Sequence, residues 1–166
     1  MPTLSHGGVE KGAMMNTMIS TNMARPENDA DRFQSTRARA HPHCVVCSPA
    51  NPLGLGQKFV LQSDWSVEGT FLANKSLEGY PGLLHGGVTA ALLDGAMTNC
   101  LFARGIHAVT AELKIRYRGR VTVKDKIVAR ASLQETHGRL LLLRSELWQG
   151  NAVKAIAFGK FVETDE

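Results

Sequence analysis

The stretch from residue 86 to residue 104 constrains the fold more than any other part of the chain. It opens with Gly86 and Gly87 and continues with apolar residues at helical spacing on every side. One face carries Val88, Ala91, Leu92, Gly95, Asn99 and Phe102, and the opposite face carries Ala90, Leu93, Met97 and Leu101. A helix that is apolar all round is a buried helix, and this one is too short and too interrupted for a membrane span. We therefore expect one long helix inside the core.

Asp94 is the one carboxylate between Gly87 and Arg104 in this stretch. Its neighbours one helical turn away, Ala90 and Met97, are apolar. A lone carboxylate in such surroundings is costly unless it is paired or functional. Apolar neighbours raise the pKa of a carboxyl group, which would make Asp94 a better general base towards water. The alternative is a structural aspartate that binds a backbone turn.

The start of this helix has a second kind of chemistry. The first backbone N–H groups of a helix have no intrahelical partner, and the helix dipole adds partial positive charge there. Gly86 and Gly87 would let a ligand atom approach that backbone closely. The pattern is typical of an oxyanion hole for a carbonyl that gains negative charge. The alternative is that the two glycines only permit tight packing of the helix.

The distance between Gly86 and Asp94 limits how the two residues can belong to one site. Gly86 and Asp94 are eight residues apart, which along a helix is about 12 Å. A base and an oxyanion donor that act on one carbon must converge within a few ångströms of it. If both take part, a site joins Gly86 of one subunit to Asp94 of another across a two-fold axis. We therefore expect a homodimer.

The composition fits a single globular domain of 166 residues, 43% hydrophobic and 20% charged. The net charge of +4 is compatible with a phosphate-bearing ligand but too small to indicate nucleic acid. Three cysteines, an odd number, fit a reducing compartment. We see no signal peptide and expect a cytoplasmic protein that does not bind membranes. Residues 1–39 are expected to form a flexible extension with a short helix near residues 29–40, and residues 40–166 to form the domain.

A Cys-x-x-Cys motif follows this extension. Cys44 and Cys47 come directly after His41 and His43. A structural zinc site usually needs four ligands, and the sequence has no second cysteine pair. We favour a structural loop, expect no metal, and keep a zinc site and a redox pair as alternatives.

The remaining chain alternates between apolar and polar residues, as strands do. A hairpin is expected from residues 57–62 and 67–73, and four strands are expected after the helix, at residues 107–121, 127–136, 139–149 and 152–163. The first of the four places Lys114, Arg116, Arg118 and Arg120 on one face. That face is either an ordinary solvated surface or a binding site for ligand phosphates. The order predicts an α+β fold in which an antiparallel sheet wraps the helix on one side and a partner subunit covers the other.

Two runs of sequence carry a resemblance to a known family. Residues 79–94 read GYPGLLHGGVTAALLD, and residues 109–117 read VTAELKIRY. Together with the Cys-x-x-Cys and Asn-Pro-Leu-Gly-Leu lead-in, they resemble the hot-dog-fold acyl-CoA thioesterases of the PaaI type over residues 44–162. The resemblance implies a curved antiparallel sheet around one long central helix, assembled as a homodimer and often as a dimer of dimers. It also implies hydrolysis of a fatty or aromatic acyl-CoA thioester without a metal or other cofactor.

The resemblance also implies roles for four residues. The Gly86 N–H would polarise the thioester carbonyl, and His85 would help shape that end of the site. Asp94 of the partner subunit would activate water or act as the nucleophile. Thr110 matches a serine or threonine that helps position the water.

The expected substrate-binding residues are Gly87 beside the helix start and Arg116 and Arg118 on the basic strand. The chain departs from the family at Gly79, where many members have an asparagine about six residues before the histidine. That departure bears on how His85 or the water is positioned, and Glu78 is an additional candidate there.

Two other functions fit the same residues. A hot-dog hydratase or dehydratase would use His85 itself as the acid and base on an enoyl or 3-hydroxyacyl thioester. A non-catalytic acyl-CoA-binding protein would keep the pocket without turnover. The expected function is that of an acyl-CoA thioesterase.

Overall fold

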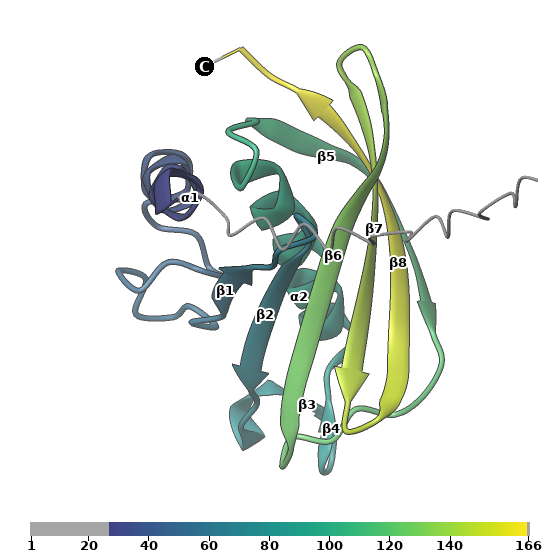
Figure 1. The fold of residues 1–166 in the computed structure, drawn as a ribbon. Helices are drawn as coiled ribbons and strands as arrows, with labels where there is room; N and C mark the ends of the chain where they lie inside the picture. The colour runs from purple at the N-terminus through teal and green to yellow at the C-terminus, as the bar shows by residue number, and fades with distance from the viewer. Residues whose placement is uncertain (1–26, 166) are drawn as a thin grey trace, which may run out of the picture.

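The expected central helix is present. The computed structural model describes residues 27–165, and in it α2 (Gly86–Phe102) lies against a strongly curved antiparallel sheet (Figure 1). The apolar residues of α2 that are buried most completely are Leu92, Leu93, Ala96, Met97, Cys100 and Leu101. They include side chains from both faces that the sequence predicted to be apolar. The hydrophobic effect therefore holds this helix in the core on several sides.

The sheet has the strands that the alternating pattern predicted. Its order is β1-β2-β6-β7-β8-β5, with every neighbouring pair antiparallel. The strands are β1 (Lys58–Leu61), β2 (Val67–Leu72), β5 (Ala108–Tyr117), β6 (Lys126–His137), β7 (Leu140–Gln149) and β8 (Ala152–Glu163). Gly138 and Gly150 have positive φ values of 59° and 58°, which the tight turns between β6, β7 and β8 require.

The core lies between the inner face of the sheet and α2. The buried strand residues include Ile127, Ala129, Leu141, Leu143, Leu147, Ala155, Ala157 and Phe161. They alternate with outward-facing residues, as a half-buried sheet requires. The α+β arrangement of one central helix and a wrapping antiparallel sheet is therefore confirmed.

A helix precedes the first strand at the position that the sequence indicated. α1 (Glu27–Ala40) contacts α2 and stands beside it in Figure 1, on the side away from β7 and β8. Phe33 of α1 is only 1% exposed and Thr36 only 2%. The packed part of the chain therefore includes α1 and begins before residue 40, so the expected flexible extension does not describe this helix. The earlier part of that expectation, residues 1–26, lies outside the described residues.

Two short strands before α2 have no counterpart in the sequence prediction. A 3-10 helix, η1 (Lys75–Leu77), leads into β3 (Glu78–Tyr80), which pairs with β4 (Leu83–Leu84). The His85 N–H donates to the Leu77 carbonyl at 2.9 Å. This small sheet therefore fixes the chain where it enters α2.

β5 is shorter than expected and lies at an edge of the sheet, where its one partner among residues 27–165 is β8. It ends at Tyr117, so Arg118 and Arg120 follow the strand instead of belonging to it. No helix among the described residues has the length and apolarity needed to cross a membrane.

Candidate active site

Asp94 lies at the middle of α2 and is held by a residue from β5. The Thr110 hydroxyl donates to Asp94 Oδ1 at 2.8 Å. Burial raises the pKa of the Asp94 carboxyl above its ordinary value, while the bond from Thr110 and the charge of His41 act in the opposite direction. The structure thus brings together two expected site residues, and their arrangement suits a general base oriented by a hydroxyl.

A bulge in β5 explains why Thr110 reaches Asp94. The pairing of β5 with β8 shifts register between Thr110 and Glu112, and a bulge of this kind changes which residues face each side of a sheet. Thr110 consequently points towards α2, whereas Lys114 and Arg116, which are an even number of residues away, point to the other face.

His41 is a neighbour of Asp94 that the sequence analysis did not assign to this site. Burial lowers the pKa of His41, the charge of Asp94 raises it, and His107 lowers it. The His41 ring meets Phe102 of α2 edge-on, with 4.7 Å between the ring centres. The sequence placed His41 only beside the Cys-x-x-Cys motif, and no local pattern signals that this loop folds back on α2.

His85 caps the start of α2 with its own ring. Its Nδ1 accepts a hydrogen bond from the Gly87 N–H at 2.9 Å. A ring nitrogen that accepts a hydrogen bond carries no proton, so in this arrangement the ring hydrogen lies on Nε2. The Gly87 N–H is therefore engaged within the helix cap, and the Nε2–H of His85 remains the polar group of that ring available to a ligand.

Gly86 has the features expected of an oxyanion donor. As the first residue of α2, it has an N–H without an intrahelical acceptor, and the residue is exposed. Its carbonyl accepts a hydrogen bond from the Tyr117 hydroxyl at 2.9 Å. Tyr117 comes from the end of β5 and was not predicted as a site residue, because it was read only as a member of the alternating strand.

The three glycines around His85 differ in what they permit. A Cβ on Gly87 would lie 3.0 Å from His85 Nδ1, and one on Gly79 would lie 3.0 Å from His85 Cδ2, which are tight contacts. A Cβ on Gly86 would lie 3.6 Å from the Tyr117 hydroxyl, an ordinary contact. Position 79, where the chain departs from the expected family pattern, thus lies directly against the His85 ring.

Glu78 belongs to the helix-start end of the site. It lies in β3 opposite Leu84 and is half-buried. Because β4 leads straight into His85, this pairing keeps the Glu78 backbone near the start of α2 instead of near Asp94.

The two expected catalytic features remain separate within one protomer. Gly86 and Asp94 lie on the same uninterrupted helix, so they are about 12 Å apart along its axis. β5 contacts both places, through Tyr117 at Gly86 and through Thr110 at Asp94. Within one chain the two groups therefore cannot act on one carbon, and we call each of them a candidate half-site.

Arg116 and Arg118 are not brought to either half-site. Arg116 pairs with Ile156 and Lys114 pairs with Phe158, and residues directly opposite in an antiparallel pair share a face. Arg116 and Arg118 line a pocket of about 490 Å³ on the outer face of the sheet, together with Arg144 of β7.

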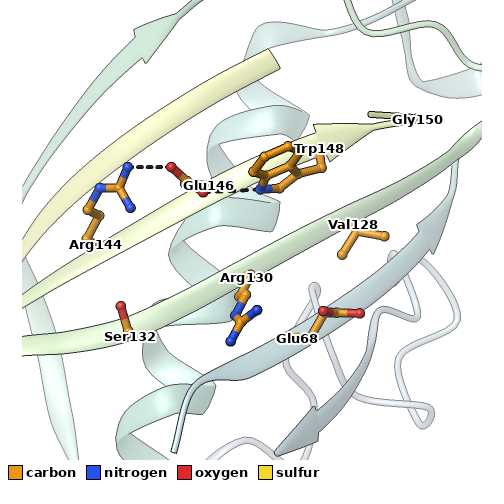
Figure 2. Close-up of a pocket in the computed structure, with 8 residues that line it drawn as sticks. All are labelled: Glu68, Val128, Arg130, Ser132, Arg144, Glu146, Trp148 and Gly150. Carbon is orange, nitrogen blue, oxygen red and sulfur yellow. Dashed lines mark hydrogen bonds and ion pairs between the residues drawn. The ribbon is translucent and has the colours of Figure 1, made fainter. Parts of the chain in front are cut away.

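A neighbouring pocket on the same outer face also contains Arg144. Figure 2 shows its lining side chains in front of the sheet, with a helix behind the strands. There Arg144 pairs with Glu146, which also accepts from Trp148 Nε1 at 3.2 Å. None of the expected site residues lines this pocket, so it belongs to the outer surface and not to the candidate active site.

Comparisons with known proteins agree with the fold and with the central motif. The model of the thioesterase superfamily matches residues 81–156. Acyl-coenzyme A thioesterase THEM4 of Rattus norvegicus is 30% identical over 93 residues, which are 54% of this chain and 40% of that protein. THEM4 of Bos taurus is 33% identical over 93 residues, which are 54% of this chain and 38% of that protein. The chain therefore spans less than half the length of these curated relatives.

Solved structures share the architecture. A thioesterase superfamily protein, RHA08564, superposes with a TM-score of 0.69 at 29% identity, covering 72% of this chain and 63% of its own. The E. coli PaaI protein from the phenylacetic acid degradation operon superposes with a TM-score of 0.70 at 15% identity, covering 82% of this chain and 96% of its own. The chain thus has the hot-dog fold. Its segment 81–156, which contains the His85-Gly86-Gly87 motif, Asp94 and Thr110, is similar to the thioesterase superfamily.

Proposed function

We propose that this protein hydrolyses an acyl-CoA thioester to the free acid and CoA. We further propose that it does so as a homodimer, in which each site combines Gly86 of one protomer with Asp94 of the other. The relatives named acyl-coenzyme A thioesterase support the reaction. The separation of the two half-sites along α2 supports the shared site.

The proposed reaction uses these groups without a metal or other cofactor. The Gly86 N–H and the helix dipole polarise the thioester carbonyl, and the Nε2–H of His85 lies on the adjacent residue as a further donor. Asp94 removes a proton from water, and the resulting hydroxide attacks the carbonyl carbon. The tetrahedral oxyanion then collapses, the C–S bond breaks, and the CoA thiolate takes up the proton that Asp94 removed from water.

Thr110 acts in this scheme by orienting the base. Its hydroxyl holds one carboxylate oxygen of Asp94, which leaves the other oxygen to bind the water. The bond also stabilises the ionised carboxylate against the effect of burial.

The incomplete burial of the N-terminal half of α2 supports the proposal that a second protomer covers it. The C-terminal half of the helix is buried, whereas Gly86 and Gly87 are exposed and Val88, Ala91 and Asp94 are only half-buried. A partner that covers this N-terminal half would also exclude water around Asp94 and strengthen each electrostatic interaction there.

We assign a phosphate-binding role to the basic pocket of Arg116 and Arg118. The two guanidinium groups can form charge-assisted hydrogen bonds with the phosphates of CoA. Because this pocket lies on the outer face of β5, a long ligand would have to pass around the edge strand. Replacing both arginines with alanine is expected to raise KM more than it lowers kcat.

The observation that carries the proposal is the Asp94 carboxylate in an apolar helix, bound by Thr110. Thiol release should be measured on short, long, branched and aromatic acyl-CoAs with the wild type and with Asp94→Asn. Loss of the base is expected to lower kcat by about a hundredfold or more on the preferred substrate. Equal, slow rates for both proteins on every substrate would refute the assignment, and tight binding without turnover would indicate a binding protein.

Protein stability provides the control for this variant. Because the pKa of Asp94 is raised in the folded state, its ionised form destabilises the fold. This loss of folding stability is absent below the ordinary pKa of an aspartate, and it is complete above the raised pKa of Asp94. Asp94→Asn is therefore expected to melt at the same or a higher temperature than the wild type at pH 7, so its lost activity would not reflect unfolding.

A further inference from the structure

Three side chains with metal-binding atoms converge at the end of α1. His41, half-buried Cys44 and buried Cys47 each offer one such atom, and these atoms all lie within 4.8 Å of one another. His41 Nδ1 is 3.8 Å from Cys47 Sγ. The three residues come from one short segment, but its fold is what turns them towards a common point.

The distance from His41 Nδ1 to Cys47 Sγ is close to that between two ligands of one tetrahedral ion. With Zn–S bonds of about 2.3 Å and Zn–N bonds of about 2.0–2.1 Å, the nitrogen and sulfur ligands of a tetrahedral zinc are about 3.6 Å apart. Two sulfur ligands are about 3.8 Å apart by the same geometry. We propose that His41, Cys44 and Cys47 bind one Zn²⁺ ion, with water in the fourth position.

A backbone N–H group of this loop already donates a hydrogen bond to one of the two sulfur atoms. The Val46 N–H donates to Cys44 Sγ at 3.4 Å, and the Ser48 N–H donates to the Cys44 carbonyl at 3.0 Å. The first bond would stabilise negative charge on a metal-bound sulfur. The turn is fixed from outside by the Gln57 N–H, which donates to the Val46 carbonyl at 2.9 Å.

The ligand set favours a borderline or soft transition metal. Two sulfur atoms and one imidazole nitrogen suit Zn²⁺, whereas Mg²⁺ and Ca²⁺ prefer oxygen ligands. Burial and the neighbouring Cys44 raise the pKa of Cys47 to about 11, so metal binding must displace thiol protons at neutral pH. A pocket of about 410 Å³, lined by His41, Cys47 and Arg37 among others, gives an ion a path from solvent.

The site would join α1 to the central helix. Val46 packs against Gly95 so closely that a Cβ at position 95 would lie 2.5 Å from Val46 Cγ1. A bound ion would therefore fix the loop against the turn of α2 that carries Asp94. The proposed site would brace this loop, and it does not depend on the proposed hydrolysis.

Metal binding can be tested directly on the 166-residue chain, without an affinity tag, after reduction and removal of metal by a chelator. Titration with Zn²⁺ against a chromophoric chelator is expected to show tight binding of about one ion per chain. Replacing Zn²⁺ with Co²⁺ should give the visible bands of a tetrahedral site and a near-ultraviolet band from cobalt–thiolate bonds. Zn²⁺ should also raise the Tm of the chelator-treated protein.

Matched variants identify the ligands. Cys44→Ser/Cys47→Ser should lose tight binding, the cobalt–thiolate band and the rise in Tm, while Cys100→Ser, which changes the buried cysteine outside the cluster, should keep all three. His41→Ala should weaken binding and alter the visible bands, and it provides a test if the double variant does not fold. Failure of the wild type to bind Zn²⁺, or unchanged binding by the double variant, would overturn the proposal, as would a Cys44–Cys47 disulfide that persists after reduction.

Discussion

The two half-sites on α2 differ in almost every physical respect. At the helix start, Gly86 is exposed, uncharged and offers a backbone N–H. Eight residues later, Asp94 is half-buried, ionisable and held by a side-chain hydroxyl. One place can stabilise negative charge that develops on a substrate, and the other can remove a proton. Each supplies what the other lacks, and one protomer keeps them apart.

The same edge strand supports both places. β5 contributes Thr110 to the carboxylate and Tyr117 to the helix start. A strand that has one neighbour in the described part of the chain thereby sets the orientation of both groups. Substitutions at the two ends of β5 should therefore affect different properties. A change at Thr110 should alter the protonation of the base, and a change at Tyr117 should alter the geometry of the oxyanion donor.

The largest effect after that of Asp94 is expected at Gly86. Gly86→Pro removes the N–H, and proline is well tolerated at the first position of a helix. His85 has φ −61° and ψ 137°, a conformation that suits a residue before proline. We expect kcat to fall by about a hundredfold to a thousandfold. Gly86→Ala is the control, because it adds a Cβ without removing the N–H, and equal rates for Gly86→Pro and wild type would exclude the donor role.

A smaller effect, mainly on pH dependence, is expected at Thr110. Asp94 acts in its ionised form, and the bond from Thr110 lowers its pKa against the effect of burial. Thr110→Val should therefore move the acidic limb of kcat/KM to higher pH and lower the rate at neutral pH roughly tenfold. Thr110→Ser keeps a hydroxyl and should restore the wild-type profile. An acidic limb that stays in place in the valine variant would mean that Asp94 is not the titrating base.

The smallest effect is expected at Tyr117. Tyr117→Phe removes one hydrogen bond to the Gly86 carbonyl, and a neutral bond of this kind contributes about 1 kcal/mol. We expect kcat to fall about fivefold at every pH. A shift of the pH profile in this variant would contradict the division of roles between the two ends of β5.

The elements with a clear period were predictable from sequence. The all-round apolar pattern located α2, and period-two alternation located β1, β2 and the four strands of the C-terminal half. β3 and β4 were missed because strands of three and two residues are too short to show a period. The packing of α1 was missed because its buried face depends on Phe33 and Thr36 within a mostly polar segment.

The site was predictable only in part. Asp94 stands out as a charge in an apolar helix, and its neighbour Thr110 was identified by resemblance. The bulge before Glu112 leaves no clear trace in the sequence, so alternation alone could not show that Thr110 and Arg116 face opposite sides. The approach of His41 to Asp94 depends on how the loop after α1 packs against α2, a long-range contact that no local pattern predicts.

The shared site can be tested by mixing two inactive proteins. In a heterodimer of Asp94→Asn with Gly86→Pro, one of the two shared sites contains an intact Gly86 and an intact Asp94. Random pairing after co-expression makes half of the dimers mixed, so about a quarter of the wild-type activity should return. If each site were formed within one chain, the heterodimer would have no intact site, because one chain lacks Asp94 and the other lacks the N–H of Gly86. Recovery near a quarter is the result we predict, and activity no higher than that of the separate variants would contradict the shared site.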